Sequence, residues 1–191
     1  MKVGIFGGTF DPVHYGHLIT AVAVKEIREL DKIIFIPSFI APHKIGLLSS
    51  SSEHRLEMLK RAIKGIPYFD YSDFEIKKEG VSYTIDTLKF LKNEYNDIEL
   101  IIGYDNLLEF STWKDPGEIL KMIKLVVLKR KVQDEPAEKD KFYYSSEIIE
   151  TPTIEISATV IRERVRNNLP INFLVPDAVM EYINRFNLYK D

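Results

Sequence analysis

Two histidines near the start of the chain, His14 and His17, have the type and spacing of residues that bind an anion. They close the segment Gly7–His17, which reads Gly-Gly-Thr-Phe-Asp-Pro-Val-His-Tyr-Gly-His. An imidazole can gain charge near neutral pH, and adjacent glycines let backbone N–H groups approach and face a ligand. Gly16 keeps the space beside the rings open. The segment therefore predicts an anion site.

The same residues permit other interpretations. One alternative is a purely structural turn with two capping histidines. The anion site is favoured over it, because a diglycine, a turn-forming Asp-Pro and two histidines coincide at one strand-to-helix junction. A metal pair is disfavoured because no third ligand is nearby in the sequence and no His-Glu-x-x-His occurs, so no protein-bound metal is predicted. A dinucleotide fingerprint fits poorly, since Gly-x-Gly-x-x-Gly is absent.

A second segment, Ile156–Arg162, reads Ile-Ser-Ala-Thr-Val-Ile-Arg. Ser157 can cap a helix, and Ser157 and Thr159 offer hydroxyls at its first turn, where backbone N–H groups lack helical partners. Arg162 lies about one and a half turns further on, and its forked guanidinium suits phosphate oxygens. Alone this is an ordinary capped helix, but together with the first segment it predicts a second anion site.

Alternating strand and helix patterns must bring these two segments together. Strands are expected at 3–6, 33–36, 100–102, 125–128 and 153–156, with a weaker candidate at 69–76. Helices are expected at 18–30, after a capping box at 50–53, from Thr84, from Pro116, after Ser157 and from Pro176. The charged stretch 129–141 reads as an exposed loop. This alternation predicts an α/β fold with a doubly wound parallel sheet, whose carboxyl edge is the place for a ligand.

The length and composition of the chain exclude several classes of protein. The chain has 191 residues, a net charge of −3 and no cysteine, which excludes a disulfide scaffold and a thiolate nucleophile. The length predicts a single domain over 1–191, with a helical C-terminal portion from about 157. The charge argues against a broadly basic nucleic-acid binder. No run approaches the roughly 20 apolar residues of a membrane span, and the first residues are too briefly apolar for a signal peptide, so no membrane partner and a cytoplasmic location are expected.

Both segments together resemble the nicotinate mononucleotide adenylyltransferase family, which shares a strand-helix layout and a His-x-Gly-His motif with class I aminoacyl-tRNA synthetases. The likeness covers nearly the whole chain. Further matching segments follow in order at Pro42–Lys44, Ser82–Thr87, Gly103–Asp105 with Trp113, and Phe173–Tyr189. The resemblance implies a Rossmann-like nucleotidyltransferase that transfers an adenylyl group from ATP to nicotinate mononucleotide, giving deamido-NAD and pyrophosphate in NAD biosynthesis.

The resemblance implies catalytic roles for His14, His17, Lys44 and Arg162, with His17 nearest the α-phosphate. The residues that it assigns to ATP are Gly7, Gly8, Thr9, Phe10, His14, His17, Gly103, Asp105, Ile156, Ser157, Thr159 and Arg162. The acceptor's phosphate is already an anion, so the reaction needs positioning and charge stabilisation rather than a protein nucleophile. Mg²⁺ is expected to enter with ATP, because it prefers phosphate oxygens and water to a protein cage.

Nicotinate mononucleotide is implied to contact Lys44, Thr84, Trp113 and Arg130. Thr84 would present the N–H groups of a helix start to the nicotinate carboxylate, and Trp113 would stack on the pyridine ring. Lys44, with His43, would steady the phosphates, and Arg130 would reach the acceptor phosphate. Each role has a structural alternative, namely an ordinary N-cap for Thr84, a core residue for Trp113 and a solvated charge run for Arg130.

Three positions depart from the family pattern. Ala158 stands where a serine is usual, Tyr104 where a small residue is usual, and Asn167-Asn168 where a glycine is usual. They predict a missing phosphate hydroxyl, a narrower pocket and a changed helix end. A related enzyme acting on nicotinamide mononucleotide, phosphopantetheine or glycerol phosphate stays open, as do a nucleotide sensor without turnover and a homo-oligomer.

Overall fold

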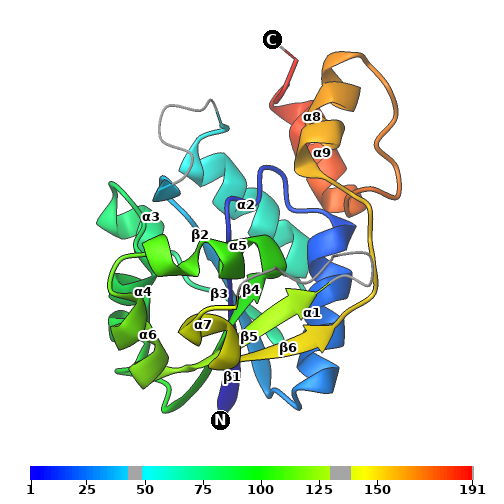
Figure 1. Ribbon diagram of the computed structural model, residues 1–191. Helices are drawn as coiled ribbons and strands as arrows, with labels where there is room; N and C mark the ends of the chain where they lie inside the picture. The colour runs from blue at the N-terminus through cyan, green and yellow to red at the C-terminus, as the bar shows by residue number, and fades with distance from the viewer. Residues whose placement is uncertain (43–48, 130–138, 191) are drawn as a thin grey trace.

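Within residues 1–42, 49–129 and 139–190, which the computed structural model describes, six parallel strands form one central sheet (Figure 1). Their order is β3-β2-β1-β4-β5-β6, and every neighbouring pair is parallel. The predicted doubly wound sheet is confirmed. The strands are β1 (Lys2–Gly8), β2 (Lys32–Pro37), β3 (Phe69–Tyr71), β4 (Asp97–Gly103), β5 (Lys124–Lys129) and β6 (Ser146–Glu150).

Helices cover both faces of the sheet (Figure 1). One face carries α1 (Tyr15–Ile27), α2 (Ser52–Ile63), α8 (Ala158–Arg166) and α9 (Asp177–Arg185). The other carries α4 (Thr84–Leu91), α5 (Tyr104–Leu108), α6 (Pro116–Met122) and α7 (Lys141–Tyr144). The short helix α3 (Phe74–Lys78) precedes α4, and a 3₁₀ turn, η2 (Phe110–Thr112), follows α5.

The two-residue period of the central strands explains why the sheet needs a layer on each side. In β2, Ile33 and Phe35 belong to one buried cluster, whereas Ile34 and Ile36 belong to the other. Successive side chains of a strand point to opposite faces, so a strand that is apolar throughout must be covered twice. The continuous apolar runs that predicted β1, β2, β4 and β5 follow from this arrangement.

The helices α8 and α9 lie together at the end of the molecule away from the N-terminus (Figure 1). Ile161 and Val165 of α8 and Val179 and Ile183 of α9 join the same buried cluster as α1 and α2. The C-terminal helices therefore share a core with one face of the sheet. In the part of the chain that the structure describes, no helix combines the length and the apolar character needed to cross a bilayer.

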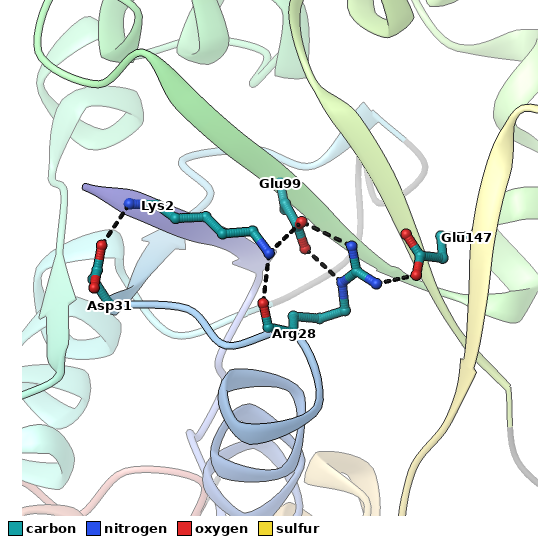
Figure 2. Close-up of polar contacts among 5 residues, drawn as sticks. All are labelled: Lys2, Arg28, Asp31, Glu99 and Glu147. Atoms are coloured by element: carbon teal, nitrogen blue, oxygen red, sulfur yellow. Dashed lines mark hydrogen bonds and ion pairs between the residues drawn. The ribbon is translucent and has the colours of Figure 1, made fainter.

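An ion cluster around the buried carboxylate of Glu99 connects the end of α1 to the sheet near the start of β1 (Figure 2). Glu99 of β4 has no exposed side-chain surface, and it pairs with Arg28 Nε at 2.9 Å and with Lys2 Nζ at 3.0 Å. Arg28 also pairs with Glu147 of β6. Burial would raise the pKa of Glu99, but the hydrogen bonds from Arg28 and Lys2 outweigh it and lower that pKa. Glu99 is therefore held as a carboxylate.

One strand expectation was wrong, and a second was too long. Residues 153–156 are not a strand, and the edge of the sheet is formed instead by β6, whose side chains are mostly exposed or half-buried. An edge strand pairs on one side only, so it does not need the apolar run that marks a central strand. Of the candidate at 69–76, only Phe69–Tyr71 joins the sheet, because the helix α3 begins at Phe74. Most of the loop expected at 129–141 lies outside the described residues.

Candidate active site

A cavity of about 450 Å³ opens at the carboxyl ends of the inner strands. Gly7 and Gly8 of β1, Ser38 after β2 and Gly103 of β4 line it. Strands β1 and β4 are the neighbours at which the strand order reverses. Such a switch point is where open α/β sheets bind ligands, and the volume suits a small molecule. The cavity therefore lies where the first motif was expected to act.

The histidine that faces this cavity is His17, in the first turn of α1. Its Nδ1 accepts a hydrogen bond from the backbone N–H of His14 at 3.2 Å. A backbone amide can only donate, so in the neutral ring the proton of His17 must sit on Nε2. The fold thus fixes the tautomer and leaves the N–H of the ring on the side away from the loop backbone.

His14 has a different environment from His17. Its ring stacks on that of His17, with centroids 3.7 Å apart, and only 6% of its surface is exposed. Burial lowers the pKa of His14 from 6.5 to about 4. The expectation that both rings gain charge near neutral pH is therefore wrong for His14, which is held neutral. His14 packs against the ring of His17 and does not line the cavity.

Close contacts favour glycine at the end of β1 and at the start of α1. A Cβ on Gly16 would lie 3.0 Å from Nδ1 and Cε1 of His14, and one on Gly8 would lie 2.9 Å from the ring of Phe10. A Cβ on Gly7 would meet nothing within 4 Å. Gly16 thus makes room for the buried imidazole, whereas Gly7 leaves the wall of the cavity open.

The second motif lies beside the first. Ser157 caps α8 by accepting the N–H of Val160 at 3.1 Å, as the sequence predicted. Arg162 donates from Nη1 to the carbonyl of Asp11 at 2.8 Å and from Nη2 to the hydroxyl of Thr159 at 3.2 Å. Ile156, Ser157, Thr159 and Arg162 do not line the 450 Å³ cavity. Arg162 reaches the loop through Asp11, and the carbonyl of Ile156 would lie 3.5 Å from a Cβ on Gly16. The chain thus brings the two expected anion motifs together.

Two of the residues expected to bind the acceptor, Thr84 and Trp113, line the cavity. Thr84 is the first residue of α4, and its N-cap residue, Tyr83, provides no capping side chain. Trp113 is half-buried and lines the cavity, while it also packs on Phe110 with ring centroids 5.1 Å apart. Its Nε1 is buried without a hydrogen-bond partner. Trp113 is therefore at once a core residue and a wall of the cavity.

The α5 region differs from expectation. Gly103 lines the cavity, but Asp105 is exposed on the first turn of α5 and does not; Asn106 and Glu109 line it instead. Tyr104 is 3% exposed and packs in the core, so it does not narrow the cavity. The residues Lys44, His43 and Arg130, to which phosphate contacts were assigned, lie outside the described residues.

Several residues at the site carried no signal in the sequence. Glu75 of α3 lines the cavity and accepts a hydrogen bond from the hydroxyl of Thr87 at 2.6 Å. Burial raises the pKa of Glu75, against the lowering effect of that bond. Ser38 lines the cavity with its buried hydroxyl unpaired. Glu75 was hidden because its segment was read as strand.

Arg55 of α2 is a further missed residue, with 1% of its surface exposed. It donates to three backbone carbonyls, those of Thr9 at 2.8 Å, Phe39 at 3.0 Å and Ser50 at 3.1 Å. It shares the buried face of α2 with Met58 and Leu59. A charged residue on an apolar helix face was the sequence signal that could have identified it.

Among the residues that the structure describes, no cluster of three or more His, Cys, Asp or Glu could hold a metal ion.

The chain is similar to known proteins in both sequence and structure. The cytidylyltransferase-like family model matches residues 5–164. A protein of Thermoanaerobacter sp. (strain X514), named "Probable nicotinate-nucleotide adenylyltransferase", is 42% identical over 200 residues, covering 100% of this chain and 95% of that protein. A protein of Caldicellulosiruptor bescii with the same name is 42% identical over 196 residues, covering 100% of both.

Among solved structures, the fold is similar to that of Plasmodium falciparum nicotinic acid mononucleotide adenylyltransferase complexed with NaAD. The TM-score is 0.79 at 19% sequence identity, and the match covers 98% of this chain and 97% of that chain. At this level of identity the likeness establishes a common fold.

Proposed function

The chain belongs to the cytidylyltransferase-like family and groups with nicotinate-nucleotide adenylyltransferases, and from this premise we propose that it transfers the adenylyl group of ATP to nicotinate mononucleotide. A phosphate oxygen of the acceptor attacks the α-phosphorus of ATP. The new P–O bond forms as the bond to the oxygen bridging to the β-phosphorus breaks, and pyrophosphate leaves with that electron pair. The products are deamido-NAD and pyrophosphate.

This reaction needs no protein base, because the attacking oxygen already carries negative charge. What the protein must supply is alignment and donors aimed at the charge that builds on the α-phosphate. The Nε2–H of His17 is such a donor, since its tautomer is fixed by the backbone N–H of His14. The neutral, stacked ring of His14 keeps that donor in place.

The leaving pyrophosphate fits the start of α8. Ser157 and Thr159 each use an oxygen to accept a hydrogen bond within the helix, so their own hydroxyl hydrogens can be donated to phosphate. Arg162 and the helix N-terminus add positive potential there. ATP would carry its Mg²⁺ as part of the substrate, with phosphate oxygens and water as the main ligands.

The acceptor fits the wall formed by Thr84 and Trp113. The start of α4 at Thr84 lacks a capping side chain, so its first N–H groups suit the carboxylate of nicotinate. Trp113 would stack on the pyridine ring, and its unpaired Nε1 could donate to the ligand. The phosphate contacts that the family resemblance implies for Lys44 and Arg130 stay part of this proposal.

One observation carries this proposal, namely the fixed Nε2–H of His17 at the cavity. The test is turnover of His17→Asn, in which the amide oxygen can replace Nδ1 as acceptor for His14 while the Nε2 donor is lost. We expect kcat to fall by about 10²- to 10³-fold, as when one transition-state donor is removed. His54→Ala is the matched control, because His54 bonds to Tyr182 at 2.9 Å between α2 and α9. Turnover of His17→Asn close to that of this control would contradict the proposal.

A further inference from the structure

Asp11, in the loop between β1 and α1, joins three distant parts of the chain. Its side chain is buried, with 4% exposed. One carboxylate oxygen accepts the hydroxyl of Tyr189 at 2.7 Å, and the other accepts the N–H of Ser50 at 3.2 Å. Its carbonyl accepts Nη1 of Arg162 at 2.8 Å. A single residue of the loop therefore connects the C-terminal tail, the start of α2 and α8.

The loop is also held by Arg55. This buried guanidinium binds the carbonyls of Thr9 and Ser50, one on the loop and one next to the N-terminus of α2. Thr9 and Asp11 are thus both fixed, three to five residues before His14. Tyr189 supplies the contact that lies furthest away in sequence, 178 positions from Asp11.

The hydroxyl of Tyr189 bonds to Asp11, and its ring packs in the core. Burial and the negative charge of Asp11 both raise the pKa of Tyr189, so the phenol keeps the proton that it donates. The ring packs against the cluster shared by α1, α2, α8 and α9. A phenylalanine would preserve that packing and remove the hydroxyl, which bonds to Asp11 at 2.7 Å and to Sδ of Met58 at 3.9 Å.

We infer that Tyr189 is a positioning residue for adenylyl transfer, because its hydroxyl holds Asp11 and, through Asp11, sets the place of Arg162. This inference rests on the proposed function. Tyr189 touches no substrate; it acts by keeping the carbonyl of Asp11 where the guanidinium of Arg162 can bind it. The C-terminal tail is then part of the ATP site, although it follows the last helix.

The test compares Tyr189→Phe with Tyr182→Phe. Tyr182 of α9 is also buried, and its hydroxyl bonds to His54 at 2.9 Å, away from the loop. Each variant loses one buried hydroxyl bond and keeps its ring. We expect Tyr189→Phe to lower kcat/KM for ATP about tenfold while KM for nicotinate mononucleotide stays within about twofold, and Tyr182→Phe to leave both unchanged. A merely structural role would not separate the two substrates or the two variants.

Coupling to Arg162 gives the decisive comparison. If Tyr189 acts through Arg162, Tyr189→Phe should have no further effect in an Arg162→Ala background, whereas independent residues would show additive losses. Additive losses, a kcat/KM for ATP equal to that of Tyr182→Phe, or failure of Tyr189→Phe alone to fold would each overturn the inference.

Failure of the proposed function would appear separately, as a wild-type chain that releases no pyrophosphate with nicotinate mononucleotide. In that case the affinity for Mg·ATP, measured by calorimetry on the same variants, replaces kcat/KM with the same expectations.

Discussion

Burial gives the two histidines of the first motif separate tasks. His14 is 6% exposed and its pKa is lowered to about 4, so it is neutral wherever the enzyme is expected to work. His17 faces the cavity and presents Nε2–H, because its Nδ1 is occupied by a backbone amide. Residue type and spacing assign both histidines to one anion site, since they carry no information on burial. The charge that the site offers to phosphate therefore comes from fewer side chains than the motif suggests.

The buried His14 predicts a pH dependence of stability. The unfolded chain binds the proton with a pKa near 6.5, whereas the folded chain binds it only near 4. The free energy of unfolding should therefore fall as the pH falls from about 6.5 to about 4, by up to about 3 kcal/mol from this residue. Urea unfolding at pH 7 and pH 4.5 measures it, with His14→Asn as the reference that lacks the titrating ring. An equal loss in wild type and variant would contradict the buried, neutral His14.

The inner strands contribute to the site at their carboxyl ends and to the stability of the fold at their amino ends. At their carboxyl ends, β1, β2 and β4 supply the backbone of the cavity. Near the start of β1, the cluster of Lys2, Arg28 and Glu99 joins α1 to the sheet (Figure 2). The two ends are separate in space, so changes at one should leave the other intact.

The variant Glu99→Gln should therefore destabilise the fold without changing catalysis. Removing the carboxylate leaves Arg28 and Lys2, which are partly exposed, without their buried partner; breaking a fully buried pair typically costs about 3–5 kcal/mol. Arg28 keeps its pair with Glu147, so the lower end of that range is expected. Chemical denaturation measures the loss, and kcat below the unfolding transition should equal that of wild type. Glu118→Gln, which breaks an exposed pair with Lys121, is the control and should show no measurable change. A stable Glu99→Gln, or one with altered kcat, would refute this division.

For the whole molecule, the sequence predicts what depends on local pattern and misses what depends on distant contact. Apolar runs identified the four inner strands, and the order of motifs identified the ligand edge. The edge strand β6 escaped, since its half-exposed side chains need no apolar run. The bond between Asp11 and Tyr189 also escaped, because no local pattern links residues 178 positions apart. Asp105 and Asn106 are neighbours in the sequence, but only Asn106 lines the cavity. Which of the two does so depends on how α5 is oriented, and the sequence pattern does not show this.

The net charge of −3 is compatible with two anionic substrates, because the positive potential of the site is local. His17 and Lys114 line the cavity, Arg162 adjoins it, and the first turns of α4 and α8 add backbone N–H groups. An uncapped helix start favours a carboxylate over a neutral amide. The nicotinate acceptor that we propose matches the wall formed by Thr84 and Trp113.

The acceptor is also the most direct test of the account. Initial rates of pyrophosphate release would be measured with ATP and, in turn, nicotinate mononucleotide, nicotinamide mononucleotide and phosphopantetheine. The account predicts the highest kcat/KM with nicotinate mononucleotide, because only that acceptor brings both a pyridine ring for Trp113 and a carboxylate for the start of α4. Pyrophosphate release with phosphopantetheine but none with nicotinate mononucleotide would contradict it.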